Sequence, residues 1–523
     1  MVVVNIIGSG LAGLSAALTL AEKGMHARLI SAQPSERAQS VLAEGGINAA
    51  LDTMGEDDTT EMHFEETVRA GALLADPAAV KGLTESAPAI VKRLAELGVP
   101  FNRNSDGSIM LRSFGGQKKK RTAFARSSTG KMIMTALTDE VRKHETAGLV
   151  ERLPHHTMIR LLIKDGDCVG VRVRDDHTGR LHDLAGIVIL ACGGLNGLFP
   201  GMTTGTVTNS GTAAAVMFAQ GVKFADLEMI QFHPTTVGIP GKRMLVSEAA
   251  RGEGGRLFSL KDGEKRYFME EKYPVLKNLM PRDVVAREIY LEKRGGAEVF
   301  LDMTGLADEI WERRLSDLRA EIMHYLPLDP KKDPIPVEPG IHYFMGGVYV
   351  NARHEASLRG LYAAGECACQ YHGANRLGGN SMLGAIYGGM TAARSAAEFR
   401  THNRIWDSDF YGMDEFDCAP SDAFSASLGY TLNEGLGIVR NDSGIRSALE
   451  SVELLDCGNP AEAAKRDLAA AMLYSALGRM ESRGAHYRED IPESFEAFRS
   501  ATVAQYRDGA VRITFEKIGG DGK

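Results

Sequence analysis

Apolar runs and glycine turns alternate at the start of the chain. Residues 2–7 form an apolar, β-branched run, which is typical of a parallel strand buried on both faces. Residues 8–13 (GSGLAG) follow, and residues 14–21 have a helical pattern that Gly24 ends. Residues 27–31 predict a second short strand. A strand, a glycine turn, a helix and a strand within about thirty residues indicate a dinucleotide-binding βαβ unit.

The glycines of this turn have separate physical roles. Gly8 permits the tight turn, Gly10 lets a pyrophosphate approach the backbone, and Gly13 lets the helix pack closely on the strand. Leu11 and Ala12 lie in the same turn and are expected to contact the cofactor, and the N-terminus of the helix that follows faces the phosphates. We therefore expect this turn to bind a dinucleotide cofactor.

Later segments add to the same cofactor fold. Ser31 stands where an acidic ribose acceptor is expected, which disfavours a plain NAD dehydrogenase. Residues 187–190 form an apolar strand that meets the glycine turn at 191–194. Residues 360–366 form a short strand that ends in Gly-Glu, and in FAD enzymes such a strand presents an acid, here Glu366, to the ribityl chain. Because these segments are far apart in the chain, another domain is expected between them.

The predicted fold class is α/β, with a Rossmann-like FAD-binding domain of the glutathione-reductase type. The chain has 523 residues, enough for two or three domains. An α+β capping domain is expected at about 232–345, inserted into an FAD-binding domain formed by 1–231 and 346–404. Helical patterns over 421–434, 443–455 and 460–483 predict a helical C-terminal domain at 405–523.

Composition narrows the classes of partner and cofactor. The formal net charge of −8 disfavours nucleic acid as the main partner. Six scattered cysteines include no CxxC, so neither an iron–sulfur cluster nor a structural zinc is expected on this chain. No signal-peptide pattern begins the sequence, and no apolar run approaches 18 residues. We expect a cytoplasmic protein that reaches a membrane only through a partner.

Five further motifs occur in a fixed order. They are residues 232–235 (FHPT), 247–255 (SEAARGEGG), 281–283 (PRD), 342–347 (HYFMGG) and 372–381 (HGANRLGGNS). Together they closely resemble the flavoprotein subunit of succinate dehydrogenase and fumarate reductase. Residues 45–50 (GGINAA) and 481–486 (ESRGAH) extend this resemblance over nearly the whole chain.

The residue types in these motifs suit a four-carbon dicarboxylate. Such a substrate carries two negative charges and needs a cationic or hydrogen-bonding group at each end. Arg376 offers a planar fork that matches a carboxylate. His233 and His342 can donate further hydrogen bonds, and Ser247 can contribute a hydroxyl.

The resemblance implies a mechanism and a set of cofactor contacts. FAD would supply a hydride from N5, and Arg282 would supply the proton, with Glu248 and Arg251 as a relay from solvent. Glu248 would also contact substrate, and His372 would approach from the FAD side. The active site would lie between the FAD and capping domains, with His342 at the hinge. The implied FAD contacts beyond residues 8–13 are Ser31, Ser40, Gly45, Gly46, Glu366, Arg376, Ser381 and Leu383.

Three departures from the family pattern bear on the cofactor. Many relatives attach FAD covalently through a histidine, and Gln39 stands at that position here. Glutamine cannot form the bond, so we predict non-covalent FAD and a bias towards fumarate reduction. Thr212 and Ser127 replace aspartates that are usual beside the FAD.

Other functions stay open at this point. L-aspartate oxidase shares the fold, but that family has a glutamate just before its Gly-Gly, where this chain has Phe114. A reductase of another unsaturated acid and a non-catalytic flavin-binding protein are further alternatives. In the family, electrons pass through a separate iron–sulfur subunit, often docked on a membrane anchor. Because this chain has no cluster ligands of its own, such a partner or a soluble electron donor is implied.

Overall fold

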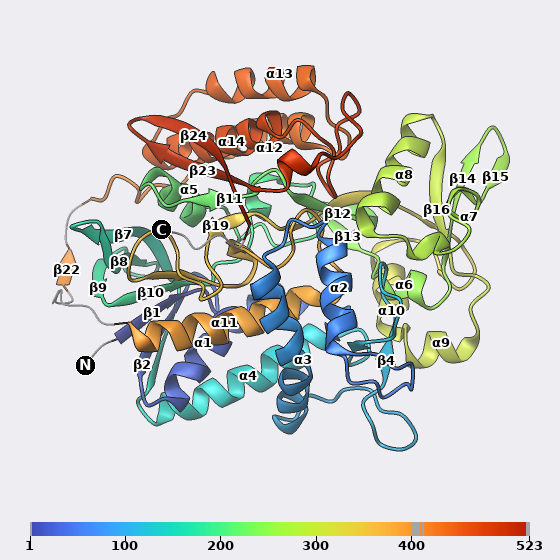
Figure 1. The fold of residues 1–523 in the computed structure, drawn as a ribbon, viewed down its shortest axis with the longest axis horizontal. Helices are drawn as coiled ribbons and strands as arrows, with labels where there is room; N and C mark the ends of the chain where they lie inside the picture. Colours follow the sequence, from blue (N-terminus) through green and yellow to red (C-terminus); the bar gives the residue numbers. More distant parts are fainter. Residues whose placement is uncertain (1–2, 400–407, 411–412, 519–523) are drawn as a thin grey trace.

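The distant segments expected to form one nucleotide fold share a five-stranded parallel sheet (Figure 1). The computed structural model describes residues 3–399, 408–410 and 413–518. Every neighbouring pair of strands in this sheet is parallel. Across the sheet the order is β20 (Leu361–Ala363), β10 (Ile187–Leu190), β1 (Val3–Ile7), β2 (His26–Ser31) and β6 (Val150–Pro154). The predicted α/β class is confirmed; residue 2 of the predicted first strand lies outside the described residues.

Helices pack on this sheet with very little space between them. The helix α1 (Leu11–Glu22) packs against α11 (Asn380–Glu398) and α4 (Thr129–Thr146), and α11 also packs against α3 (Pro77–Glu96), which contacts α2 (Thr60–Ala70) (Figure 1). A side chain at Gly13 would overlap the Gly8 carbonyl, and one at Gly389 would overlap the Ala12 carbonyl. Gly13 therefore has the packing role that the sequence predicts.

Two smaller sheets complete this part of the molecule, and short 3₁₀ helices occur in all three parts of the chain. One sheet has the order β22 (Ser408–Phe410), β9 (Leu181–Ala185), β8 (Asp167–Asp175) and β7 (His156–Lys164). The other has the order β3 (Ile47–Asn48), β5 (Thr122–Ala123) and β4 (Leu111–Arg112). The 3₁₀ helices along the chain are η1 (Ser35–Arg37), η2 (Gln39–Leu42), η3 (Asn196–Leu198), η4 (Lys277–Leu279), η5 (Gly365–Cys367) and η6 (Glu496–Phe498).

The segment between β12 (Ile230–Ile239) and β18 (Glu338–Phe344) projects to the right of Figure 1. These two strands pair in an antiparallel sheet with β13 (Lys242–Leu245). A second sheet has the order β15 (Glu264–Arg266), β14 (Arg256–Lys261), β16 (Glu298–Asp302) and β17 (Ile335–Pro336). The helices are α6 (Ala249–Gly252), α7 (Phe268–Lys272), α8 (Arg282–Arg294), α9 (Asp308–Arg313) and α10 (Ser316–Tyr325). This capping part has its own hydrophobic core, and its limits at 232 and 345 stay a prediction.

The C-terminal part has the three expected helices, but the last one is shorter than predicted. They are α12 (Asp422–Leu436), α13 (Asp442–Glu453) and α14 (Pro460–Gly478). The prediction that the third helix reaches residue 483 is wrong. Arg479 leaves the helical conformation and its buried guanidinium pairs with Asp226, Glu228 and Glu481. These long-range ion pairs outweigh the local helical pattern.

A hairpin that the sequence analysis did not predict joins this part to the cofactor fold. Its strands are β23 (Ala501–Arg507) and β24 (Ala510–Glu516). The sheet continues in the order β11 (Phe224–Ala225), β19 (Gly347–Tyr349) and β21 (Ala368–Cys369), and α5 (Thr212–Ala219) packs against α14. The predicted boundary at 404/405 lies outside the described residues.

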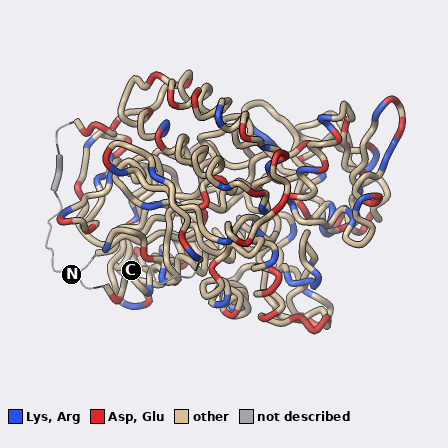
Figure 2. The backbone as a smooth tube through the Cα atoms, turned by 45° about the horizontal axis from the view of Figure 1, so that its top comes forward, with Lys and Arg blue, Asp and Glu red and all other residues tan. Residues whose placement is uncertain are grey.

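Basic and acidic residues are interspersed along the backbone (Figure 2). Within the described ranges, no helix is long and apolar enough to cross a membrane. Within the same ranges, no three His, Cys, Asp or Glu side chains are grouped so that they could hold a metal ion.

Candidate active site

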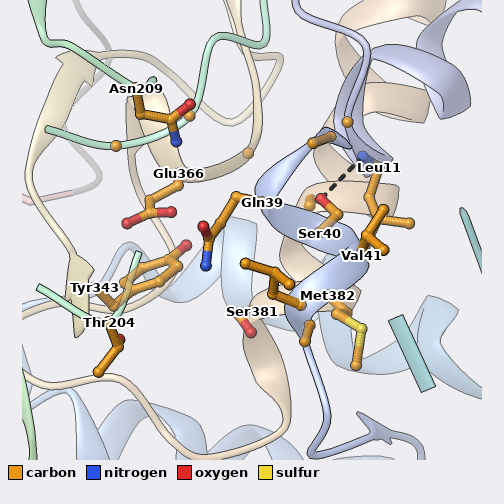
Figure 3. A pocket seen from close by; sticks show the side chains of 18 of the residues that line it. Leu11, Gln39, Ser40, Val41, Thr204, Asn209, Tyr343, Glu366, Ser381 and Met382 are labelled. Atoms are coloured by element: carbon orange, nitrogen blue, oxygen red, sulfur yellow. Dashed lines mark hydrogen bonds between the residues drawn. The ribbon is translucent and has the colours of Figure 1, made fainter. Parts of the chain in front are cut away.

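A cavity of about 580 Å³ extends from the glycine turn after β1 to the capping part (Figure 3). This volume lies in the range of small-molecule and cofactor sites, roughly 300–1,000 Å³. The predicted site residues that line it are Gly8, Gly10, Leu11, Ala12, Ser31, Gln39, Ser40, Gly45, Gly46, Phe114, Ser127, Thr212, His233, Ser247, Glu248, Arg282, His342, Glu366, Arg376 and Ser381. Expected cofactor and substrate residues therefore face one continuous space.

The glycine turn has the geometry of a phosphate cradle. Gly8 has φ +115°, and a side chain there would overlap the Ala191 carbonyl. Gly10 is the N-cap of α1 and, as a glycine, has no side chain of its own to cap the helix. The Leu11 N–H donates to Ser40 Oγ at 3.3 Å, as the dashed line in Figure 3 shows. Since helix N-termini bind anions, this turn fits the pyrophosphate of a dinucleotide.

Glu366 lies where an acceptor for a sugar or ribityl hydroxyl is expected. It follows β20, and its Oε1 accepts a hydrogen bond from the Phe344 N–H at 3.1 Å. A side chain at Gly194 would overlap this carboxyl group, so only glycine leaves room for it. Burial raises the pKa of Glu366 to about 7. Ser31 lines the cavity while its hydroxyl donates to the Gln33 carbonyl at 2.7 Å.

The segment at 39–46 forms another wall of the cavity. The Oε1 atom of Gln39 accepts a hydrogen bond from the Thr206 N–H at 2.6 Å. Gly46 has φ +136°, and a Cβ there would lie 2.5 Å from a Thr122 methyl group. A Cβ on Gly45 would lie 2.8 Å from the Phe114 ring, so the buried ring packs directly on this glycine.

A chain of charges begins at the first residue of α8. Arg282 Nε and Nη2 donate to Glu248 Oε2 at 3.0 and 2.7 Å, and Nη1 donates to Gln231 Oε1 at 3.1 Å. Arg251 Nη2 donates to Glu248 Oε1 at 3.1 Å, and Nη1 donates to the Asn278 carbonyl at 2.7 Å. Burial raises the pKa of Glu248, but Arg282 and Arg251 lower it by more, so the carboxylate is ionised at neutral pH.

Two histidines face each other across the pairing of β12 with β18. The ring centroids of His233 and His342 are 5.1 Å apart. Burial lowers the pKa of both rings well below 6.5, and the charge of Arg282 adds to the effect, so both are neutral at pH 7. His342 Nδ1 lies 2.8 Å from the Thr204 hydroxyl, and His233 Nδ1 lies 3.1 Å from the Thr235 carbonyl oxygen. Ser247 is buried and lines the same cavity.

Arg376 presents a buried guanidinium beside these histidines. It stacks over the Tyr343 ring, with its carbon 4.2 Å from the ring centroid. Among the described residues, its Nε atom has no hydrogen-bond partner. Burial lowers the pKa of Arg376 to about 9, and the charge of Arg282 adds to this, so it is still cationic at neutral pH. A buried cation with an unused donor fits an anionic ligand.

Four predicted site residues do not line the cavity. Gly13 lies where α1 packs closely on the Gly8 carbonyl, and Arg251 contacts Glu248 without lining the cavity. His372 lies edge-on to Tyr343, with ring centroids 5.3 Å apart. Leu383 is fully buried in the hydrophobic core, while Ser381, Met382 and Ala385 of the same helix line the cavity. The Leu383 side chain therefore faces the core and not the cavity, and its predicted FAD contact stays a prediction.

Three residues that hold the site together are not among the predicted site residues. Tyr343 follows His342 in the motif at 342–347, and Gln231 directly precedes the motif at 232–235. The motifs could therefore have marked both residues. Thr204 has no such signal. Thr204 lies before the capping part in the chain, and its contact with His342 arises only from the tertiary structure.

Comparisons with known proteins find similar flavoproteins over nearly the whole chain. Residues 3–382 match the model of the FAD binding domain family, and residues 463–520 match the model described as fumarate reductase flavoprotein C-term. A succinate dehydrogenase flavoprotein subunit of Bacillus subtilis strain 168 is 35% identical over 93% of this chain and 91% of that protein. An L-aspartate oxidase of Mesorhizobium japonicum is 34% identical over 93% of this chain and 91% of that enzyme.

Solved structures show a similar whole-chain fold. A mutant FrdA chain of the E. coli quinol fumarate reductase superposes with a TM-score of 0.87 at 27% identity. The match covers 100% of this chain and 97% of that chain. The FAD-binding, capping and C-terminal parts are therefore arranged as they are in a fumarate reductase chain.

Proposed function

The chain belongs to the family of succinate dehydrogenase and fumarate reductase flavoprotein subunits, which are FAD oxidoreductases, and on that premise we propose that it interconverts fumarate and succinate, with a bias towards fumarate reduction. The observation that carries this proposal is the position of Arg282. It is held between Glu248 and Gln231, and it lines the same cavity as the glycine turn.

The residues present fit FAD. The turn at Gly8 and Gly10 would hold the pyrophosphate, Ser31 would contact the ribose, and Glu366 would accept a hydrogen bond from the ribityl chain. Bound FAD supplies the hydride that one carbon of fumarate accepts. Gln39 cannot form the covalent bond to FAD that many relatives have, so the cofactor dissociates under denaturing conditions.

The charges of the site match a dianion. Arg282, Arg251 and Arg376 carry three positive charges, and Glu248 offsets one of them. About two positive charges are left for the two carboxylates of fumarate. The neutral His233 and His342 rings and the Ser247 hydroxyl add hydrogen-bond donors without adding charge.

Arg282 is the group placed to give the proton. Two of its nitrogens contact Glu248 Oε2, so after Arg282 gives up a proton, the Glu248 carboxylate, which is ionised at rest, takes up a proton from the solvent side and passes it to the guanidine. Arg251 contacts the other carboxyl oxygen and continues the relay. The cation at Arg282 also stabilises the negative charge that develops on the substrate in the transition state.

Phe114 favours fumarate over L-aspartate. Homology alone does not separate the two functions, since relatives of both kinds are about equally similar. The Phe114 ring packs on Gly45 and lies 3.1 Å from an ideal Cβ of Gly378. An ammonium group placed against this ring would lose hydration without gaining a carboxylate of its own, because the neighbouring Glu248 is already paired with Arg282 and Arg251. L-aspartate is therefore expected to be a poor substrate.

A partner is needed to deliver the electrons. We infer an iron–sulfur subunit, docked on a membrane anchor, because the described residues hold no cluster-binding group and the relatives are named as subunits. This places the chain in the cytoplasm and peripheral to the membrane. Co-purification of a tagged chain with an iron-containing protein tests this part of the proposal.

The test of the reaction is turnover with a reduced viologen dye as electron donor. We expect fumarate to oxidise the dye in the presence of the flavin-loaded protein, and other unsaturated acids to do so at least tenfold more slowly. Faster turnover with another unsaturated acid would change the substrate. Bound flavin with no turnover of any acid would support a non-catalytic flavin-binding protein.

A further inference from the structure

Residues 203–208 join the cofactor side of the cavity to the substrate side. Thr204 Oγ1 lies 2.8 Å from His342 Nδ1 on β18. Two residues later, the Thr206 N–H donates to Gln39 Oε1 at 2.6 Å. We propose that Thr204 is a positioning residue that sets the tautomer of His342, and that Gln39 holds the segment at 203–208 in place for it. The inference rests on the proposed fumarate site.

The direction of the Thr204 hydrogen bond follows from its other contacts. The Thr204 hydroxyl has a second acceptor, the Ile341 carbonyl, but at 3.5 Å that contact is at the limit of a hydrogen bond. The same carbonyl already accepts the Thr204 N–H at 2.9 Å. The hydroxyl proton therefore points to His342 Nδ1. A neutral ring that accepts at Nδ1 carries its proton on Nε2.

The tautomer matters because the ring is held neutral. His342 is buried and faces His233, Arg282, Arg376 and Glu248. Its pKa is well below 6.5, so a second ring proton is not available at neutral pH. With Nε2 protonated, His342 donates a hydrogen bond to a substrate carboxylate. With Nδ1 protonated, it would present a lone pair to the carboxylate and repel it.

Gln39 gives the segment at 203–208 a fixed position. It opens η2, the same short helix in which Ser40 accepts the Leu11 N–H of the glycine turn. On the other side, Thr203 forms a bridge to Ile341, and its carbonyl accepts the Arg243 N–H at 3.1 Å. Figure 3 shows Gln39, Thr204, Tyr343 and Glu366 around the cavity. The residue that replaces the linking histidine thus acquires a role of its own.

The kinetic test compares Thr204→Val, Thr204→Ser and Thr431→Val. The first removes the hydroxyl at nearly constant volume, and the second restores a hydroxyl. The third is a matched control, because the Thr431 hydroxyl donates to the Ser427 carbonyl on the distant α12 and has no other hydrogen-bond partner in the described part of the chain. We expect Thr204→Val to raise the KM for fumarate about tenfold with kcat changed less than threefold. The reason is that the variant no longer fixes the His342 tautomer that donates one hydrogen bond to the charged substrate. Thr204→Ser should stay within about threefold of wild type.

Gln39→Leu tests the anchor. We expect it to raise the KM for fumarate by about threefold to tenfold, and the double variant with Thr204→Val to be no worse than about twofold beyond Thr204→Val alone. Independent, multiplying effects of the two substitutions would overturn the anchoring role. Flavin content, measured for each variant, separates this effect from loss of cofactor.

The tautomer itself is measured by ¹⁵N NMR of the histidine rings in the flavin-loaded protein, with His342→Gln for assignment. We expect a protonated Nε2 on His342 in the wild-type protein and a mixture of tautomers in Thr204→Val. A protonated Nδ1 in the wild-type protein, or an unchanged spectrum in Thr204→Val, would overturn the inference. If wild-type protein does not turn over fumarate, the proposed function fails, and the NMR result still decides the role of Thr204.

Discussion

Replacing Arg282 with alanine tests the assignment of the proton donor. The change removes the donor and also the cation that faces the substrate. A general acid contributes roughly 10²–10⁴-fold to the rate. A single preorganised electrostatic contact contributes roughly 10²–10³-fold. Because both effects come from one side chain they overlap, so we expect kcat for fumarate reduction to fall at least about 1,000-fold.

The same change has a structural cost that must be measured with it. Glu248 loses both hydrogen bonds at Oε2 and keeps only Arg251 at Oε1. Breaking a buried pair costs about 3–5 kcal/mol. The pKa of Glu248 rises when Arg282 is absent, so the carboxyl group can take up a proton and reduce that cost. We expect a lower Tm with normal flavin content.

The assay is fumarate-dependent oxidation of a reduced viologen dye, with flavin content and Tm determined on the same samples. Arg282→Lys is the matched control, because it keeps a charge but loses the fork that contacts Glu248 and Gln231. It should retain the fold while it loses most of the activity. Turnover of Arg282→Ala within tenfold of wild type would refute the reasoning.

Three further predictions concern the cofactor and the fold. Gln39→His tests whether Gln39 alone prevents the covalent bond to FAD. We expect flavin to stay with the variant in a denaturing gel. Release of the flavin would mean that the surrounding site also prevents the bond. In the cofactor-free protein, burial raises the pKa of Glu366 from 4.5 to about 7, so stability present below pH 4.5 is lost as the pH rises to about 7. We would measure urea unfolding of the wild type and of Glu366→Gln at pH 5 and at pH 8. The loss of stability between the two pH values should be smaller in the variant, by at most about 3 kcal/mol, and an equal loss in both proteins would contradict this prediction. Arg479→Leu leaves Asp226 and Glu228 buried without their cation, so thermal unfolding should report a loss of at least about 3 kcal/mol, and a Tm within 2 °C or so of wild type would contradict the pairing.

Local patterns along the chain predicted the cofactor fold well. The first βαβ unit, the strand at 187–190 and the strand that leads to Glu366 are found in one parallel sheet. Each has a strong local signal, because buried parallel strands are continuously apolar and glycine turns mark the phosphate site. The end of the last helix could not be predicted in this way, since Arg479 is drawn out of it by carboxylates more than 200 residues away.

The candidate site divides in the same way. His233, His342, Arg282 and Arg376 line one cavity as the motifs predicted. The two histidines lie on the paired strands β12 and β18, Arg282 begins α8, and Arg376 lies in the loop before α11. Leu383 does not line the cavity, since a motif gives no indication of the helix face on which each residue lies. The contact of Thr204 with its histidine also depends on tertiary structure and has no sequence pattern.

The proposed reduction of fumarate is tested most directly by reoxidation of the reduced flavin. The flavin-loaded protein is reduced with dithionite under anaerobic conditions and mixed in separate runs with fumarate and with iminoaspartate. The account predicts rapid return of the oxidised flavin spectrum with fumarate, and no peroxide from L-aspartate in air. Peroxide from L-aspartate, or a reduced flavin that fumarate does not reoxidise, would contradict it.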